Sequence, residues 1–290
     1  MNKEFEFLNI ISNTLKSPEY LGDDCAYLKE FNLAISTDTL IEDVHFSLSY
    51  MMPKEIAKKA LLVNVSDILA FGAMPKYATI SLSGKLNKEF VENFYLGVRE
   101  IEDEFSIRII GGDLTKSDKI VVGVTIIGDC TNRNISSRKN AKDGYIVATV
   151  GEFGSSAQGL ECLFNNIQNE YFTLLHKEPK LYPEISNEIA FKALNPYAMM
   201  DSSDGLIDCL VQISQKSNVK IDIEYEKISK KTSNRDFVLC GGEDYSLVVC
   251  LSEDDYMKIG SLTKIGLCST GSGVFVDGKK IEYKGFKHFE

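Results

Sequence analysis

The chain has 290 residues, of which 44% are hydrophobic and 26% are charged, a composition typical of a globular protein with a substantial buried core. Its formal net charge of -10 argues against nucleic-acid binding through a broad basic face, because the nucleic-acid backbone is itself anionic. No apolar stretch approaches the roughly 20 residues of a membrane-spanning helix, and the N-terminus does not resemble a signal peptide, so we expect a soluble, cytoplasmic protein.

Short β-branched segments alternate with longer segments of helical period, which indicates mixed α and β structure. The first helical segment, residues 54–71, carries Asn64 and Asp67 among apolar residues, and buried polar groups there need partners. The second, residues 87–105, has apolar residues three or four positions apart, as in a helix packed on a sheet. The expected strands span residues 33–37, 77–83, 107–110, 120–128, 145–150, 220–225 and 246–251.

The polar segment 131–142 follows one predicted strand and precedes another, which makes it the best candidate for a junction between two domains. We place the boundary at Arg138, with an N-terminal domain over residues 1–138 and a C-terminal domain over residues 139–290. No internal repeat with a period of about 20 to 50 residues interrupts this division. The sequence therefore predicts an α/β (α+β) protein of two domains.

Six short acidic clusters, each flanked by glycine or hydroxyl residues, occur across both halves of the chain. They are Gly22-Asp23-Asp24, Ser36-Thr37-Asp38, Ser66-Asp67, Gly111-Gly112-Asp113, Asp201-Ser202-Ser203-Asp204 and Gly241-Gly242-Glu243-Asp244. Most are expected where a strand ends or a helix begins, which is where α/β proteins gather ligand groups. Capping or a turn explains any single cluster, whereas six together favour a ligand site.

If these carboxylates meet in space, a cation must lie among them. Two carboxylates about 4 Å apart repel each other by about 4 kcal/mol at an effective dielectric constant near 20. Oxygen ligands of this kind favour Mg²⁺, which usually brings a phosphate group with it. The clusters therefore predict a magnesium and phosphate site.

Two glycine-rich segments are candidates for contact with phosphate. The paired glycines before Asp113 suit a loop whose backbone approaches phosphate oxygens, with a tight turn as the alternative. Residues 151–159 form a glycine-punctuated junction between a strand and a helix, where an anion could bind. Because neither a Walker motif nor the protein-kinase signature is present, the two commonest ATP-binding folds are not supported.

The chain has only three histidines, and one of them lies close to an acidic cluster. His45 follows Asp38 closely in sequence, whereas His176 and His288 lie in polar or terminal segments and are assigned no role. With no nucleophile elbow, a Ser-His-Asp hydrolase is not supported. Arg138 could bind phosphate through its fork of donors, with a solvated loop charge as the alternative.

Seven scattered cysteines without Cys-x-x-Cys spacing argue against a disulfide framework and against a thiolate metal site. This usage favours a reducing compartment such as the cytoplasm. Cys25 lies beside an acidic cluster and could be a reactive thiol, but free cysteine is more often a small buried apolar residue. We therefore expect a packing role for Cys25.

Seven segments, taken in chain order, resemble motifs of the thiamine-monophosphate kinase family, which belongs to the superfamily of aminoimidazole ribonucleotide synthetase and selenophosphate synthetase. They are GDDCA, ISTDTLIEDVHF, KALLVNVSDILAFGA, IIGGDLTKS, VGEFGSSAQGL, MMDSSDGL and GGEDYSL. The resemblance implies two α/β domains, with the N-terminal sheets of two copies joined in the barrel of a homodimer. It also implies transfer of the ATP γ-phosphoryl group to thiamine monophosphate on several Mg²⁺ ions, giving thiamine diphosphate and ADP.

The resemblance also implies a role for each residue that matches a family motif. The implied metal ligands are Asp24, Ser36, Thr37, Asp38, Asp67, Asp113, Asp201 and Asp204, of which Asp38, Asp67, Asp113 and Asp204 form the catalytic set. The implied ATP contacts are Gly112, Asp113, Arg138 and Ser203, and the implied thiamine phosphate contacts are His45, Glu243 and Tyr283. Asp23 and Asp244 are left as structural partners of these residues.

Four positions depart from the family pattern. Tyr20 and Asp43 stand where glycine is usual, Lys116 stands where arginine is common, and Tyr283 takes the place of a frequent tryptophan. The aromatic face of a tyrosine can still stack on a cationic thiazolium. The alternatives to the kinase are another ATP-dependent member of the superfamily, such as a selenophosphate synthetase, and a non-catalytic protein that binds magnesium and nucleotide.

Overall fold

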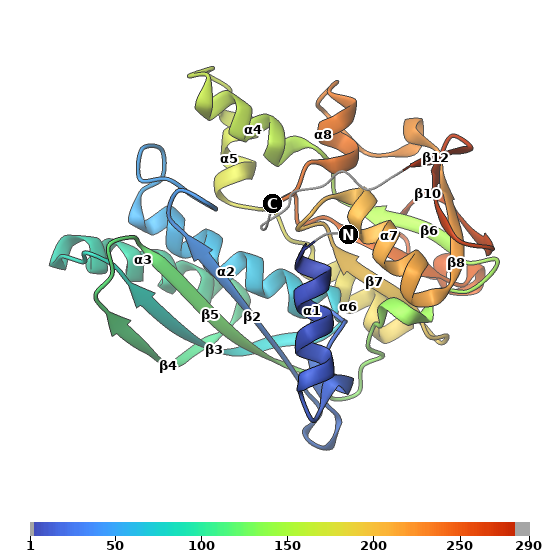
Figure 1. Ribbon diagram of the computed structural model, residues 1–290, viewed down its shortest axis with the longest axis horizontal. Coiled ribbons are helices and arrows are strands. Elements are labelled where there is room, and N and C mark those ends of the chain that lie inside the picture. The colour runs from blue at the N-terminus through green and yellow to red at the C-terminus, as the bar shows by residue number, and fades with distance from the viewer. Residues whose placement is uncertain (1–2, 282–290) are drawn as a thin grey trace.

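The computed structural model describes residues 3–281, which form two sheets with helices packed on them (Figure 1). The helices are α1 (Lys3–Thr14), α2 (Pro53–Ala70), α3 (Lys88–Phe105), α4 (Ser155–Phe164), α5 (Glu170–Lys177), α6 (Pro183–Lys192), α7 (Leu206–Ser217), α8 (Arg235–Cys240) and α9 (Glu253–Tyr256). The mixed α and β class predicted from the sequence is confirmed. Among the described residues, no helix combines the length and the apolar character needed to cross a membrane.

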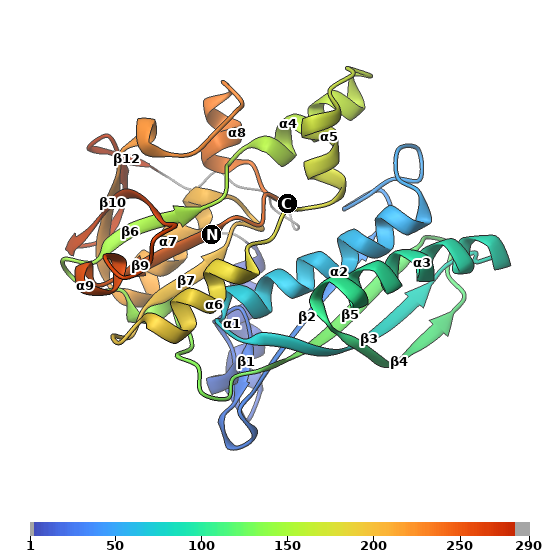
Figure 2. The same cartoon turned by 180° about the vertical axis from the view of Figure 1, so that it is seen from behind.

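The first sheet is open and has the strand order β1-β2-β5-β3-β4, in which only β3 and β4 are parallel. Its strands are β1 (Ala26–Leu28), β2 (Leu33–Ile41), β3 (Met74–Ser83), β4 (Arg108–Thr115) and β5 (Val121–Asp129). Helices α2 and α3 lie together on one side of this sheet, as Figures 1 and 2 show. We call the side of the sheet turned away from α2 and α3 its open face.

The second sheet has the strand order β12-β11-β8-β10-β6-β9-β7, in which β11 and β8 are parallel. Its strands are β6 (Ile146–Val150), β7 (Ala198–Asp201), β8 (Val219–Ile223), β9 (Leu247–Leu251), β10 (Thr263–Thr270), β11 (Gly273–Val276) and β12 (Lys279–Ile281). All strands of the first sheet precede the polar segment 131–142, and all strands of the second follow it. Arg138 thus lies between the two sheets in sequence, although a domain boundary at this residue stays a prediction.

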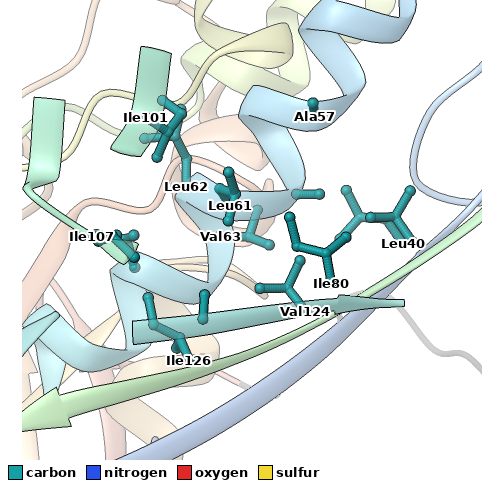
Figure 3. Packing of buried hydrophobic residues seen from close by; sticks show 14 of the residues in the cluster. Leu40, Ala57, Leu61, Leu62, Val63, Ile80, Ile101, Ile107, Val124 and Ile126 are labelled. Atoms are coloured by element: carbon teal, nitrogen blue, oxygen red, sulfur yellow. The ribbon is translucent and has the colours of Figure 1, made fainter. Parts of the chain in front are cut away.

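Helix α2 is buried on nearly all sides because it packs against the first sheet, α3 and the C-terminal part of the chain. A helix that is apolar all round belongs in such a position. Figure 3 shows its residues facing the strands and α3; the labelled side chains are Leu40, Ala57, Leu61, Leu62, Val63, Ile80, Ile101, Ile107, Val124 and Ile126. Both helices expected from the sequence are confirmed within one or two residues at each end.

All seven predicted strands are present, but two of them continue beyond their predicted ends. Strand β2 reaches Ile41 and strand β4 reaches Thr115, so Ser36-Thr37-Asp38 and Gly111-Gly112-Asp113 lie inside strands. The prediction that these clusters sit at strand ends is wrong. Polar residues fit mid-strand here because alternate side chains point to the open face of the sheet.

The second of the paired glycines in β4, Gly112, serves strand packing. A Cβ atom on Gly112 would lie 1.9 Å from the carbonyl oxygen of Ile80 on the neighbouring strand β3, so a side chain there would push the two strands apart. Because both glycines lie inside β4, neither the loop nor the tight turn expected from the sequence is present, whereas contact of Gly112 with phosphate stays a prediction. Glycine at this position is instead a requirement of the β3–β4 pairing.

Candidate active site

Aspartates from separate segments converge between the two sheets. Carboxylate oxygens of Asp24, before β1, of Asp67 on α2 and of Asp201 at the end of β7 all lie within 4.8 Å of one another. Asp38 of β2 lies close to Asp204, which precedes α7, and to Asp24; after burial, the charges of these two residues raise the pKa of Asp38. We call these five residues the carboxylate cluster. The chain thus brings together five of the eight metal ligands implied by the family resemblance.

The carboxylate cluster is poorly compatible with full ionisation. Burial, followed by the charges of neighbouring carboxylates, raises the pKa of Asp201 to about 8 and holds the pKa of Asp67 well above its ordinary value. The Oδ2 atom of Asp201 is buried and has no hydrogen-bond partner among the described residues. Several hard oxygen donors around an unpartnered buried oxygen fit a divalent cation such as Mg²⁺.

Helix α2 supplies the polar partners that hold strand β2 at the cluster. The Asn64 side chain accepts a hydrogen bond from the backbone N–H of Asp38 over 2.9 Å and donates to the carbonyl of Ala60 over 2.9 Å. The Ser36 hydroxyl donates a hydrogen bond to Asp67. These contacts satisfy the Asn64 side chain and bring Ser36 to the cluster as a neighbour of Asp67.

Arg138 neutralises part of the cluster. Its Nη2 atom lies 2.8 Å from Oδ1 of Asp24, and both side chains are largely buried. Burial nevertheless outweighs this ion pair and raises the pKa of Asp24 above its ordinary value. Asp23 accepts hydrogen bonds from the Ser137 hydroxyl and from the backbone N–H of Arg138, each over 2.8 Å. This structural role agrees with the expectation for Asp23.

Three of the implied ligand residues lie elsewhere. Thr37, Gly112 and Asp113 line a groove of about 560 Å³ on the open face of the first sheet, with the hydroxyl residues Thr39, Thr79, Ser81, Ser83 and Thr125. We call it the hydroxyl groove. Thr37 cannot share a face with Ser36 and Asp38, because successive side chains in a strand alternate. Within one copy of the chain, Thr37 and Asp113 therefore do not join the carboxylate cluster.

A second hollow, of about 210 Å³, is lined by residues of α4, of α5 and of the segment that follows β2. Figure 2 shows the course of these three segments. The lining of this hollow includes His45, Tyr50, Phe164, His176 and Glu243, and we call it the histidine pocket. The ring centroids of Tyr50 and Phe164 are 6.4 Å apart, and those of Tyr50 and His176 are 6.2 Å apart. The walls can therefore receive an aromatic or heteroaromatic ring.

Two acidic residues line the histidine pocket, Asp43 and Glu243, and Glu243 is the less exposed of them. Its Oε2 atom lies 3.2 Å from Nζ of Lys59 and 3.4 Å from Nδ1 of His176. Burial opposes ionisation of Glu243, but Lys59 and His176 outweigh it and lower the pKa of Glu243. Burial and then Lys59 lower the pKa of His176 to about 4, so this imidazole is neutral at pH 7. The pocket therefore offers the ionised carboxylate of Glu243 beside aromatic surfaces.

The C-terminal acidic cluster is divided between two tasks. The backbone N–H of Glu243 donates to the carbonyl of Ser203 over 2.6 Å, which ties the histidine pocket to the carboxylate cluster. Asp244 instead accepts hydrogen bonds from the backbone N–H groups of Gly154 and Ser156 over 2.6 and 2.9 Å. The N-terminus of α4, a candidate anion site in the sequence, is thus filled by the chain's own Asp244, whose expected structural role is confirmed.

The structure also explains two sequence features near these sites. Asp43 adopts φ 63°, a left-handed conformation that favours glycine and that aspartate tolerates, and its carboxylate pairs with Lys119 at 3.4 Å. Cys25 is 4% exposed, and burial raises the pKa of its thiol well above the ordinary value, as suits a packing role. Tyr283 and His288 lie outside the described residues.

Comparison with known proteins assigns the fold and the family. Residues 22–130 match the family described as AIR synthase related protein, N-terminal domain. A thiamine-monophosphate kinase from Aquifex aeolicus is 36% identical, with 99% of this chain and 98% of the relative covered. One from Bacillus subtilis is 33% identical, with 93% of each covered. The chain belongs to the thiamine-monophosphate kinase family.

A solved structure of this family extends the assignment to three dimensions. The structure described as AaThiL complexed with AMPPCP and TMP is similar to this chain with a TM-score of 0.90 and 35% identity, covering 99% of this chain and 97% of that one. The fold implied by the motifs, which resembles aminoimidazole ribonucleotide synthetase, is therefore confirmed. Whether two copies of the first sheet meet in a barrel is not tested by this agreement.

Sequence reasoning on this kinase-family chain missed Tyr50, Phe164 and His176 of the histidine pocket, and it missed Lys59, which contacts Glu243 from behind the pocket lining. Lys59 had a detectable signal, because it is a cation within a helix whose other residues are mostly apolar. His176 had none, since it lies in a short helix far in sequence from every acidic cluster. The interpretation of His176 as a residue without a role is wrong in one respect, because it lines the pocket and contacts Glu243.

Proposed function

We propose that the protein is a Mg²⁺-dependent thiamine-monophosphate kinase, which transfers the γ-phosphoryl group of ATP to the phosphate of thiamine monophosphate and yields thiamine diphosphate and ADP. One observation carries the proposal: a cluster of five aspartates, among them the buried Asp201, lies next to an aromatic pocket with an ionised carboxylate. The first half suits phosphate groups held on metal ions, and the second suits a cationic heteroaromatic ring.

The aspartates of the carboxylate cluster are proposed to hold several Mg²⁺ ions, with Ser36 supporting Asp67. Bound Mg²⁺ supplies the positive charge that phosphoryl transfer needs, because the ATP tail and the acceptor phosphate are both anionic. The acceptor is already ionised at neutral pH, so the protein needs no general base. The role of its side chains is to bind, orient and shield the two phosphate groups.

The substrate contacts follow from the two sides of the site. Gly112, Arg138 and Ser203 are proposed to contact ATP, and His45 and Glu243 are proposed to contact thiamine phosphate. Tyr50 and Phe164 are placed to flank its cationic thiazolium ring, which the ionised Glu243 would also attract. A role of Tyr283 in the same pocket remains part of the proposal.

A homodimer is proposed through the open face of the first sheet. The hydroxyl groove, with Thr37, Gly112 and Asp113, lies on that face. Joining two such faces would bring these residues against a second copy and give them the neighbours that one chain lacks. Sedimentation equilibrium is expected to give twice the chain mass of 32.4 kDa, and a monomer at micromolar concentration would contradict the dimer.

The activity is tested by incubating the purified protein with ATP, Mg²⁺ and thiamine monophosphate. Equal amounts of thiamine diphosphate and ADP are expected, and omission of Mg²⁺ should abolish both. Absence of thiamine diphosphate over a range of Mg²⁺ and K⁺ concentrations would refute the kinase. ATP binding without ADP release would instead indicate a non-catalytic nucleotide-binding protein. We propose that the kinase acts in the cytoplasm.

A further inference from the structure

Lys59 is a fully buried cation that the proposed chemistry does not use. It lies on α2 and is 0% exposed. A lysine is almost never buried to this extent unless it is paired, because removal of its charge from water is expensive. Its position on a mostly apolar helix therefore needs an explanation in terms of what it contacts.

The contacts of Lys59 are the two residues proposed to bind thiamine phosphate. Its Nζ atom donates a hydrogen bond to the backbone carbonyl of His45 over 3.2 Å and another to Oε2 of Glu243 over 3.2 Å. His45 follows β2, whereas Glu243 precedes β9 in the second half of the chain. One buried ammonium thus joins both sides of the histidine pocket.

We propose that Lys59 is a positioning residue for the acceptor substrate, which fixes the Glu243 carboxylate and the His45 backbone without touching the substrate itself. This inference rests on the proposed function. The complete burial of Lys59 prevents direct contact with a ligand in the pocket. The effect of Lys59 must therefore pass through Glu243 and His45.

The charges around Glu243 support this role. Glu243 faces Lys59 from α2, His176 from α5, and His45 and Tyr50 from the segment after β2. Because His176 has a pKa of about 4 and is neutral at pH 7, Lys59 supplies the positive charge beside Glu243 in the wild type. Burial raises the pKa of Glu243 while Lys59 lowers it, so removal of Lys59 leaves a carboxyl group that binds a proton at higher pH.

The test is steady-state kinetics on Lys59→Gln and Lys59→Met in the full-length protein. The KM for thiamine monophosphate is expected to rise on the order of tenfold, while the KM for ATP changes by less than about twofold. Lys58→Gln is the matched control. Lys58 neighbours Lys59 on the same helix and pairs with Glu100 and Glu178, but no contact of its side chain with Glu243 is recorded among the described residues.

A pH profile distinguishes positioning from a merely structural role. In the wild type, the KM for thiamine monophosphate should rise as the pH is lowered, and the midpoint of this rise should lie at a pH below the usual pKa range of a glutamate. In Lys59→Gln, this rise is expected to move to higher pH by about one unit or more, because an opposite charge at this distance lowers a carboxyl pKa by about that amount. The profile of Lys58→Gln should match the wild type.

Coupling to Glu243 completes the test. In a Glu243→Gln background, Lys59→Gln should add little to the KM for thiamine monophosphate. The inference is overturned if Lys59→Gln leaves this KM unchanged, if the KM for ATP rises equally, or if the full effect persists without Glu243. Circular dichroism shows whether each variant folds. If Lys59→Met does not fold, the test uses Lys59→Gln alone, because glutamine keeps hydrogen-bond donors at this position. Wild-type protein without product refutes the kinase itself, whereas an active wild type with unchanged variants refutes only the role of Lys59.

Discussion

Replacement of Asp67 by asparagine is expected to lower kcat for thiamine diphosphate formation by about a thousandfold or more. Asp67 lies among Asp24, Asp38 and Asp201 and accepts a hydrogen bond from Ser36, so it is the most central carboxylate of the cluster. Asparagine keeps the size of the side chain but removes the charge that would hold Mg²⁺. The measurement is kcat at saturating ATP, thiamine monophosphate and Mg²⁺.

The same substitution should leave the metal-free protein at least as stable as the wild type. Burial and neighbouring carboxylates raise the pKa of Asp67, so its ionised form costs folding free energy. This cost grows as the pH rises above the ordinary value of 3.8 toward the raised pKa, and the Asp67→Asn protein should gain in relative stability over that range. Denaturant unfolding in the presence of a chelator measures the difference.

Asp118→Asn provides the matched control for the loss of a carboxylate. Its side chain is 94% exposed and pairs with Lys85 far from the cluster, so activity and stability should both stay close to those of the wild type. Near-normal turnover of Asp67→Asn would refute the metal role of this residue. A marked loss of stability in Asp67→Asn without metal would show that the carboxylate serves the fold and not a bound ion.

Much of the site could be predicted because the motifs are local. Each acidic cluster combines carboxylates with small residues over a few positions, and their order along the chain matched one family over nearly its whole length. Asp67 could be singled out because a carboxylate in an apolar helix needs a partner or a ligand. The convergence of four of the six acidic clusters could be expected from the number of such positions, since each one alone also suits a turn or a cap.

The errors in the predicted strands arose where the apolar pattern of the sequence is interrupted by polar residues. Strand β2 was expected to stop at Thr37, because the polar residues Thr37, Asp38 and Thr39 interrupt the apolar pattern. The strand continues, since its covered face resumes at Leu40 and its open face accepts polar side chains. That continuation separates Thr37 from Asp38, because adjacent residues of a strand point to opposite faces.

The histidine pocket was beyond the reach of local patterns for a different reason. Lys59 and Glu243 are 184 positions apart in sequence, and His176 reaches Glu243 from a third segment. Contacts of this kind are determined by the packing of α5 against α2. The sequence places the cation Lys59 in a mostly apolar helix, but it does not indicate that Glu243 is the partner that offsets the cost of burying this charge.

Replacement of Arg138 by methionine is expected to lower the free energy of unfolding by about 3 to 5 kcal/mol when no metal is present. The side chains of Arg138 and Asp24 are 16% and 4% exposed, and their ion pair is 2.8 Å long. Without the guanidinium group, Asp24 stays buried beside Asp67 and Asp201 with no cation nearby. Urea unfolding of both proteins in the presence of a chelator measures the loss.

Two further measurements separate charge from packing as the cause. The double variant Arg138→Met with Asp24→Asn should regain most of the lost stability, because the unpaired charge has been removed. Excess Mg²⁺ should also reduce the deficit of Arg138→Met, since a divalent ion in the carboxylate cluster replaces the missing positive charge and stabilises the folded state by mass action. If the double variant is no more stable than Arg138→Met, the guanidinium acts through its contacts with Gln212 and the surrounding backbone, and the neutralisation of the cluster by Arg138 is refuted.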